Sequence, residues 1–365
     1  MIRIAINTQS CPYEALIEDG LLSSAAACLA ELLPDCRKCF IITSPVVRRY
    51  HGRALLASFV KTRIEHHLLE MQDGERAKTL KSVGSLAVKL CKLNADRASV
   101  LVALGGGVVG DVTGFLASIY MRGTRFVQIP TTFLAQVDSS VGGKTGVNLS
   151  EGKNLIGTFH QPVMVLIDPA TLKTLPARQY IAGLFEALKA GIIRNRRIFE
   201  FMEENRERIL QREPSALEWL TAEAVRVKAA VVSEDEREQG LRRILNFGHT
   251  LGHALEAETR YRRFLHGEAV AWGMVGAAMI SAGMKVCSTE TAQRIINAVL
   301  AYAPLPVVEV RARAILHRLM HDKKTVHDKV HFVLPVDIGK VEIVNNVPEK
   351  AVLQAVEELR YLSRT

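Results

Sequence analysis

The pattern of apolar and polar positions changes in character near the middle of the 365-residue chain. In the first half, short apolar runs alternate with stretches whose apolar residues recur at helical spacing. These runs predict strands at residues 38–43, 98–104, 126–130 and 163–167, and a helix at residues 77–93. Strands that alternate with helices favour a parallel sheet with crossover helices.

Helix-forming sequence dominates after residue 175, for example at residues 216–232, and a late strand signal appears at residues 331–334. The mostly apolar run 269–284 is shorter than the roughly 20 residues that span a bilayer, so we expect a buried helix there. We therefore predict a Rossmann-like α/β domain over residues 1–175 and a mostly α-helical domain over residues 176–365.

The formal net charge of +9 allows three kinds of partner: nucleic acid, an anionic membrane surface or a small anionic substrate. Lysine and arginine are spread in short pairs instead of one stripe, and the 6% of aromatic residues leaves few platforms for base stacking. The chain also starts without an apolar stretch behind a basic one. We expect a cytoplasmic protein with no nucleic-acid or membrane partner, in which a few basic side chains line an anion pocket.

Six cysteines are irregularly spaced along the chain, and only Cys36 and Cys39 form a CxxC motif. No second CxxC follows to complete a zinc site, and this motif does not open a helix after a strand as in thioredoxin. We therefore expect reduced structural thiols.

A glycine loop directly follows the strand predicted at residues 98–104. Gly105, Gly107 and Gly110 fit the pattern GxGxxG and precede a helix-compatible run at residues 112–118. Such a loop lets the backbone approach a pyrophosphate at a helix N-terminus, although a tight turn without a ligand gives the same pattern. The loop lies about a hundred residues into the chain, which is unlike an ordinary dehydrogenase.

A second glycine segment, Gly142-Gly143-Lys144-Thr145, resembles the end of a phosphate-binding loop. Asp138 stands where that motif needs a glycine, which excludes a P-loop NTPase. Charged and polar residues within an otherwise apolar segment predict a pocket. These residues are Asp138, Lys144, Lys153 and Asn154.

Histidines gather in the second half of the chain. His249 and His253 share a helix face, His266 follows thirteen residues later, and Glu186 lies upstream. Two histidines and a carboxylate are a common set for a catalytic divalent metal ion. Thr250 replaces the glutamate of HExxH, which excludes the zinc-protease motif. Spacing alone favours His249 and His253 as the ligand pair, and ordinary polar histidines are the alternative.

Several long motifs together resemble the 3-dehydroquinate synthase family of sugar-phosphate cyclases. They are GGGVVGDVTGF, RGTRFVQIPTTFLAQVDSSVGGKTGVN, GKNLIG, DERE, RRILNFGHTLGHALEAE and HGEAVAWGM, and the likeness runs from about residue 75 to residue 324. The resemblance implies an NAD-binding α/β domain and a helical metal-binding domain. It also implies that 3-deoxy-D-arabino-heptulosonate 7-phosphate is converted to 3-dehydroquinate and phosphate, the second step of the shikimate pathway.

The resemblance also implies a role for each matching residue. The zinc or cobalt ligands would be Glu186, His249 and His266, so His253 would instead contact the substrate phosphate. The residues expected in catalysis are Lys144, Lys189, Lys228, Arg242, Asn246 and His253. Those expected to bind substrate are Asp138, Lys153, Asn154, Lys324 or its neighbour Lys323, and Arg122 from the other subunit of a homodimer. Those expected to bind NAD are Glu75, Lys78, Gly106, Gly107, Val108, Asp111, Thr131 and Thr132.

The chain departs from the family pattern at four positions. Ser44 stands where an acidic or amide residue often holds a ribose, and Phe185 and Ala190 flank the Glu186 segment in place of the usual residues. Asp328 replaces a glycine. None of these changes removes a chemical group that the reaction requires.

Three other functions remain open from the sequence. Another cyclase could act on sedoheptulose 7-phosphate, but Arg242, Asn246 and His253 match the pocket for a carboxylate-bearing heptulosonate. A metal-dependent glycerol-type dehydrogenase would share the fold. A basic nucleic-acid-binding protein would leave the histidine and carboxylate set without a role.

Overall fold

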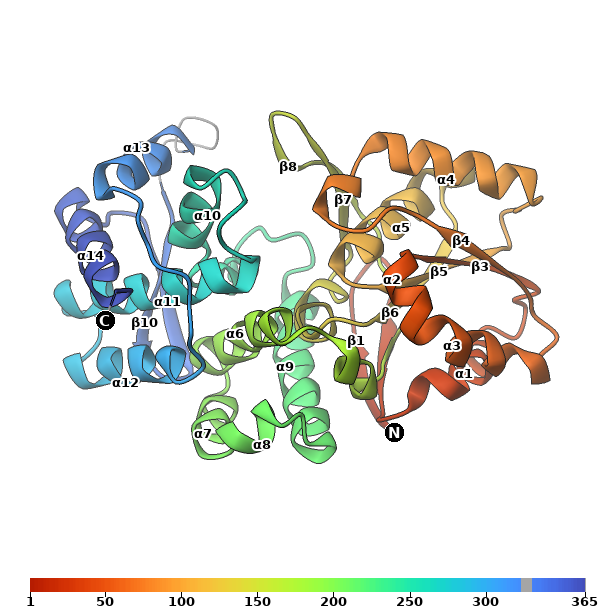
Figure 1. Cartoon of the computed structure of the whole chain (residues 1–365), viewed down its shortest axis with the longest axis horizontal. Helices are drawn as coiled ribbons and strands as arrows, with labels where there is room; N and C mark the ends of the chain where they lie inside the picture. Colours follow the sequence, from red (N-terminus) through yellow and green to blue (C-terminus); the bar gives the residue numbers. More distant parts are fainter. Residues whose placement is uncertain (323–329, 365) are drawn as a thin grey trace. The chain divides into compact units, whose positions relative to one another are not determined.

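The computed structural model describes residues 1–322 and 330–364 and forms two compact units (Figure 1). Unit 1 contains Met1–Pro176 and Arg212–Arg237, and unit 2 contains Ala177–Gln211 and Glu238–Thr365. An α/β unit and a mostly helical unit confirm the expected fold class. The division differs from the expected one in the segment Arg212–Arg237, which belongs to the first unit.

Within the described residues, unit 1 contains a seven-stranded sheet. Its strands are parallel except for the antiparallel edge pair β1–β2, and the four strands expected from the sequence are β3, β5, β6 and β9. The strands lie in the order β1 (Ile2–Ile6), β2 (Tyr13–Ile17), β9 (Met164–Ile167), β6 (Arg125–Pro130), β5 (Val100–Gly105), β3 (Lys38–Thr43) and β4 (Glu65–Glu70).

Helices cover both faces of this sheet, which explains why its central strands are continuously apolar. In β3, Cys39 and Ile41 face one core cluster, whereas Phe40 and Ile42 face the other. The first cluster includes residues of α1 (Ala25–Leu32) and α3 (Arg53–Ser58), and the second includes residues of α4 (Leu80–Lys92) and α5 (Gly107–Ile119). The short helix α2 (Pro45–Val47) follows β3.

Helix α9 (Pro214–Glu234) belongs to the first unit because its apolar face packs on the edge of the sheet. Its buried residues join a core cluster that also holds residues of β1, β2 and β9. They recur at helical spacing and are Ala222, Val225, Ala229 and Val232. A helix that lies after the sheet in sequence thus returns to cover it.

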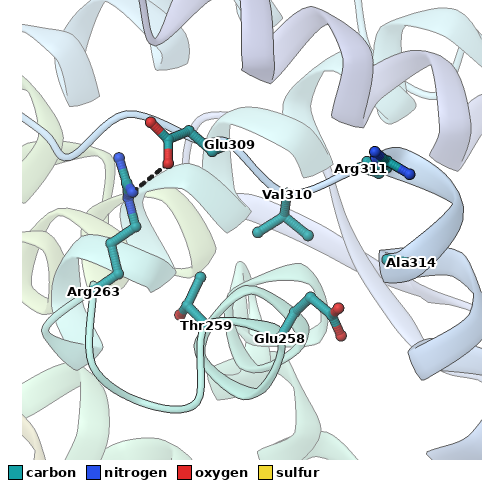
Figure 2. A pocket seen from close by; sticks show the side chains of 7 residues that line it. All are labelled: Glu258, Thr259, Arg263, Glu309, Val310, Arg311 and Ala314. Carbon is teal, nitrogen blue, oxygen red and sulfur yellow. Dashed lines mark hydrogen bonds and ion pairs between the residues drawn. The ribbon is translucent and has the colours of Figure 1, made fainter.

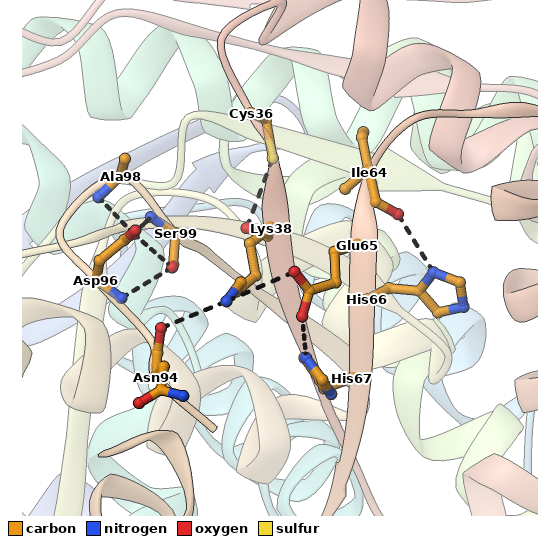
Figure 3. A network of polar contacts seen from close by, with 10 residues as sticks. All are labelled: Cys36, Lys38, Ile64, Glu65, His66, His67, Asn94, Asp96, Ala98 and Ser99. Atoms are coloured by element: carbon orange, nitrogen blue, oxygen red, sulfur yellow. Dashed lines mark hydrogen bonds and ion pairs between the residues drawn. The ribbon is translucent and has the colours of Figure 1, made fainter. Parts of the chain in front are cut away.

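A network of polar contacts lies at the amino-terminal ends of strands β3 and β4 (Figure 3). Lys38 Nζ lies 3.5 Å from Glu65 Oε2 and donates a hydrogen bond to the Asn94 carbonyl oxygen over 3.5 Å. The nearby Cys36 and Cys39 are buried, and burial raises the pKa of both thiols. All six cysteines lie within the described residues and none forms a disulfide, as expected for reduced structural thiols.

Unit 2 is built around α11 (His266–Gly283), which confirms the expected buried helix. Its neighbours are α6 (Ala177–Ile193), α10 (His249–Glu258), α12 (Thr289–Leu300), α14 (Glu349–Leu362) and β10 (Phe332–Asp337), which pairs with β11 (Lys340–Val344). The remaining helices of the unit are α7 (Arg196–Glu204), α8 (Arg206–Leu210) and α13 (Ala312–Asp322). None of the described helices has the length and apolar character of a membrane span.

Two glycines let α11 approach its neighbours at backbone distance. A Cβ atom added at Gly267 would lie 1.8 Å from the carbonyl oxygen of Ala182 in α6. A Cβ atom added at Gly273 would lie 1.8 Å from the carbonyl oxygen of Gly248, the residue before α10. These contacts bring together the three helices that carry the predicted metal ligands.

We expect Gly267→Ala to lower the free energy of unfolding by at least about 2 kcal/mol, because the new methyl group meets backbone that cannot rotate away. Gly283→Ala is the matched control, since it ends the same helix and its added methyl group meets no atom within 4 Å. Urea unfolding followed by circular dichroism measures both variants. Equal stability of the two variants would contradict this account of the packing.

Candidate active-site residues in the two units

The glycine loop lies where the order of strands in the sheet reverses. From β3 the chain passes outward to β4, whereas from β5 it passes to β6 on the other side. Ligands of open α/β sheets bind at the carboxyl ends of strands next to such a point. The segment that follows β5 at this point contains Gly106, Gly107 and Val108, which were expected to bind NAD.

The local geometry of this loop suits a phosphate group. Helix α5 begins at Gly107, so its first backbone N–H groups have no partner within the helix and can bind an anion. A Cβ atom added at Gly106 would lie 2.9 Å from Thr132 Cγ2, so the loop is closely packed against the segment after β6. The Thr131 N–H donates to the Gly105 carbonyl oxygen over 3.0 Å. The structure therefore brings these expected NAD-binding residues together.

A buried polar network connects the remaining expected NAD-binding residues. The Lys78 ammonium group pairs with the Asp111 carboxylate and donates to Asn154 Oδ1 over 2.5 Å. Burial raises the pKa of Asp111, and the charge of Lys78 opposes that shift. Asn148 donates to Glu75 Oε1 over 2.7 Å and accepts from the Asn154 N–H over 2.9 Å. Asn154, expected to bind substrate, thus lies in the same network as Glu75, Lys78 and Asp111.

Other expected substrate residues of unit 1 lie on α9 and on a β-hairpin. Lys228 of α9 donates to both the side chain and the carbonyl oxygen of Asp138, each over 2.6 Å. Lys144 begins β7 (Lys144–Leu149) and is exposed. Lys153 lies near the opposite end of the hairpin on β8 (Gly152–Phe159), whose antiparallel register places Lys144 across from Phe159. Arg122 is exposed after α5.

In unit 2, a buried carboxylate lies between two imidazole rings. Glu186 of α6 is 2% exposed, and its Oε1 lies 3.9 Å from His249 Nε2 and 3.6 Å from His266 Nε2. Among the described residues, no group donates a hydrogen bond to this oxygen. The other carboxylate oxygen forms an ion pair with Lys189. An unsatisfied buried carboxylate oxygen facing two imidazole nitrogens suits a divalent cation.

Both imidazole rings are held through the nitrogen that faces away from Glu186. His249 Nδ1 lies 3.1 Å from the Phe247 carbonyl oxygen, and His266 Nδ1 lies 3.1 Å from Glu256 Oε2. An acceptor at Nδ1 favours the tautomer with a proton there, which leaves the Nε2 lone pair available to a metal ion.

The two histidines differ in their charge environment. Burial, followed by the charge of Lys189, holds the pKa of His249 well below its usual value. Burial also opposes the charged form of His266, but the hydrogen bond that its Nδ1–H donates to Glu256 and the charge of Glu186 raise its pKa. The two pKa values are therefore shifted in opposite directions, downward for His249 by burial and upward for His266 by its carboxylate neighbours.

His253 lies in the same cluster, one helical turn after His249. One ring nitrogen each of His249, His253 and His266 lies within 4.8 Å of the others, and His253 is the exposed member. The ring centroids of His253 and His266 are 5.7 Å apart. The structure thus gathers both the pair suggested by spacing and the set implied by the family resemblance.

The remaining expected residues of unit 2 lie just before α10. Arg242 is buried, and Asn246 donates from Nδ2 to Glu238 Oε1 over 2.9 Å. Lys324, the alternative Lys323 and Asp328 lie outside the described residues.

Sequence reasoning missed two residues that contact the expected set. One is Asn148, whose position in a hairpin gave no signal. The other is Glu256, which continues the helical spacing of His249 and His253 and could have been found from that spacing.

A separate hollow of about 260 Å³ lies in unit 2 (Figure 2). An ion pair of 2.6 Å between Arg263 and Glu309 forms part of its wall. None of the residues predicted to form the active site lines it. The lining residues are Glu258, Thr259, Arg263, Glu309, Val310, Arg311 and Ala314.

The chain matches two family models for 3-dehydroquinate synthase. The model of the N-terminal part matches residues 68–182, and the model of the C-terminal part matches residues 183–325. The 3-dehydroquinate synthase of Koribacter versatilis is 54% identical over 363 residues, which cover 100% of this chain and 99% of the relative. The likeness therefore extends over the whole length of both proteins.

Two solved structures are also similar to the chain. The 2-epi-5-epi-valiolone synthase of Streptomyces hygroscopicus subsp. jinggangensis 5008, with NAD+ and Zn2+ bound, is 29% identical with a TM-score of 0.88, covering 96% of this chain and 97% of that chain. A 2-deoxy-scyllo-inosose synthase complexed with carbaglucose-6-phosphate, NAD+ and Co2+ is 28% identical with a TM-score of 0.86, covering 98% and 99%.

Metal titration separates the two possible ligand sets. We expect Glu186→Ala and His249→Ala to weaken Zn2+ binding by more than the roughly 10–100-fold loss that follows removal of an outer partner. We expect His253→Ala to bind Zn2+ with nearly the affinity of the unsubstituted protein, as should the control His317→Ala at an exposed histidine of α13. Competition with a chromogenic chelator measures each affinity. Loss of binding in His253→Ala but not in Glu186→Ala would exchange their roles.

Proposed function

The chain belongs to the 3-dehydroquinate synthase family, and on that premise we propose that it converts 3-deoxy-D-arabino-heptulosonate 7-phosphate into 3-dehydroquinate and phosphate. The reaction is the second step of the shikimate pathway and uses NAD and a divalent metal ion. The structural observation that carries the proposal is the buried Glu186 oxygen that faces the Nε2 atoms of His249 and His266.

The metal ligands are Glu186, His249 and His266. Lys189 forms an ion pair with Glu186, and the acceptors at both Nδ1 atoms leave the Nε2 lone pairs available to the ion. When bound, the ion supplies positive charge that offsets negative charge developing on the substrate oxygens. Zinc or cobalt suits two imidazoles and a carboxylate, and the two similar structures contain one of these metals each.

NAD is held by the loop that opens α5. The backbone N–H groups of Gly107 and Val108 bind its pyrophosphate, and the absence of a Cβ atom at Gly106 keeps the loop close to Thr132. When bound, NAD accepts a hydride and returns it within one turnover, so it is not consumed. The other residues assigned to NAD are Glu75, Lys78, Asp111 and Thr131.

The substrate carries a phosphate and a carboxylate, and the chain supplies cations for both. Arg242 grips the carboxylate, since a guanidinium group can donate two parallel hydrogen bonds to it. His253 is exposed beside the proposed metal ligands and contacts the phosphate. Lys228 is aimed by its two hydrogen bonds to Asp138. The other residues assigned to substrate are Lys144, Lys153, Asn154, Lys189, Asn246 and Lys324.

These groups suit a reaction in which a transient oxidation makes elimination possible. Oxidation at C5 makes the C6 proton acidic, and the phosphate of the substrate accepts that proton as it leaves. Reduction at C5, ring opening and an intramolecular aldol closure then give the product. The chain thus needs to bind and orient its substrate without supplying a separate side-chain base.

A homodimer and a cytoplasmic location remain predictions. Close to the exposed Arg122 in sequence, the apolar side chains of Ile119 and Met121 are also exposed, by 49% and 41%. Met121 and Arg122 also have left-handed backbone angles, with φ of 49° and 68°. Such conformations cost free energy and occur where contacts or function require them. We propose that a second subunit covers this segment and receives Arg122 at its phosphate site.

The central experiment incubates purified, metal-loaded protein with the heptulosonate phosphate and a small amount of NAD. We expect phosphate and 3-dehydroquinate to form together, with many turnovers per NAD. His249→Ala should form neither product, whereas His317→Ala should be fully active. Activity with sedoheptulose 7-phosphate alone would indicate another cyclase, and net NADH formation from an alcohol would indicate a dehydrogenase.

A mixing experiment tests the proposed role of Arg122. Arg122→Ala and His249→Ala should each be inactive alone, but co-expression should restore about a quarter of the activity, because half of the dimers then contain one complete site. Phosphate release measures the activity. Absence of restoration, although mixed dimers form, would show that Arg122 does not act across subunits.

A further inference from the structure

A buried glutamate holds one of the proposed metal ligands from behind. Glu256 lies on α10, seven residues after His249, and is 3% exposed. Its Oε2 lies 3.1 Å from Nδ1 of His266, which is the first residue of α11. The Nε2 atom of the same ring faces Glu186 Oε1 at 3.6 Å. The imidazole of His266 therefore bridges a carboxylate and the proposed ion site.

The two proposed histidine ligands are held in different ways. His249 Nδ1 has a neutral carbonyl oxygen as its partner, whereas His266 Nδ1 has an ionisable carboxylate. Burying a carboxylate is costly unless it is paired or accepts hydrogen bonds. A carboxylate behind a metal-bound imidazole fixes the ring orientation and tautomer and strengthens the nitrogen as a ligand. Glu256 is thus placed to fix the orientation and tautomer of the His266 ring.

The backbone of His266 is fixed by other contacts, so Glu256 acts mainly on the ring. Glu268, also on the first turn of α11, accepts two hydrogen bonds from Arg178 of α6 over 2.6 and 2.8 Å. It also accepts from the N–H of Leu265 over 2.8 Å. Together with the close approach at Gly267, these contacts place the start of α11 without the help of Glu256.

We propose that Glu256 is a positioning residue of the metal site, which orients the His266 ring and strengthens its Nε2 atom as a ligand. The inference rests on the proposed metal-dependent function. It adds to that function a residue that does not touch the substrate, the cofactor or the ion.

Metal affinity tests the proposal without depending on turnover. In Glu256→Gln the amide oxygen can still accept from Nδ1 but the charge is lost, and we expect Zn2+ binding to weaken about 10-fold. In Glu256→Ala both are lost, and we expect a loss approaching 100-fold. Competition with a chromogenic chelator gives the affinities. The visible absorption of the Co2+-saturated proteins should change as well, because the His266 ring would then bind the ion in another orientation and less strongly. A merely structural role of Glu256 would leave this absorption unchanged.

Glu258→Gln is the matched control. Glu258 lies on the same helix, pairs with Arg318 over 2.9 Å and lines the separate hollow of Figure 2. The Glu258→Gln variant should bind Zn2+ with an affinity within about twofold of that of the unsubstituted protein, since a surface ion pair contributes little. Thermal unfolding of the metal-free proteins checks that each is folded, and Glu256→Gln preserves the test if Glu256→Ala does not fold.

The outcomes separate the inference from the function on which it rests. Unchanged Zn2+ affinity and Co2+ spectrum in Glu256→Gln and Glu256→Ala would overturn the inference alone. An equal loss in Glu258→Gln would overturn it too, because the effect would then be one of general charge. Failure of the unsubstituted protein to bind Zn2+ or Co2+ would instead overturn the metal-dependent function.

Discussion

The backbone contacts of α11 are the constraint on which the proposed metal site depends. Glu186, His249 and His266 lie on three helices, and their side chains are too short to meet unless those helices nearly touch. Gly267 and Gly273 permit this, because any side chain there would overlap a carbonyl oxygen. The site is therefore a result of helix packing and needs no flexible loop to assemble it.

Paired burial of charge is the second feature that organises both units. Lys78 with Asp111, Lys228 with Asp138, and Lys189 with Glu186 each place an ammonium group against a carboxylate. Removing such charges from water costs several kcal/mol each, which the pairing only partly offsets. Stability alone gives little reason for three such pairs. The proposed ligands give a reason, because Lys78 is proposed to bind NAD, Lys228 the substrate, and Lys189 lies beside the proposed metal ligand Glu186. Cations held in fixed positions need little reorganisation when an anion binds.

The sequence predicted most of the fold because its signals were local. The short apolar run of β3 and the helical spacing of α4 are visible within a few residues, and both elements form close to the expected positions. The assignment of α9 to the first unit was not visible, because it depends on which distant surface its apolar face covers. The edge strand β1 was missed for a similar reason. Strand β1 forms by pairing with β2, and a run of five residues is by itself a weak signal for a strand.

The same distinction between local and distant contacts explains what the sequence could say about the metal ligands. Spacing within one helix connects His249 to His253, and the structure does place their ring centroids 5.2 Å apart. No spacing rule could connect either histidine to Glu186, which lies more than sixty residues earlier, so only the family resemblance identified it. In the folded chain Glu186 is the buried group with an unsatisfied oxygen, whereas His253 is exposed. Lys189 pairs with one oxygen of this carboxylate and leaves the other facing two imidazole nitrogens, whereas an exposed imidazole is satisfied by water, so burial favours Glu186 as the ligand.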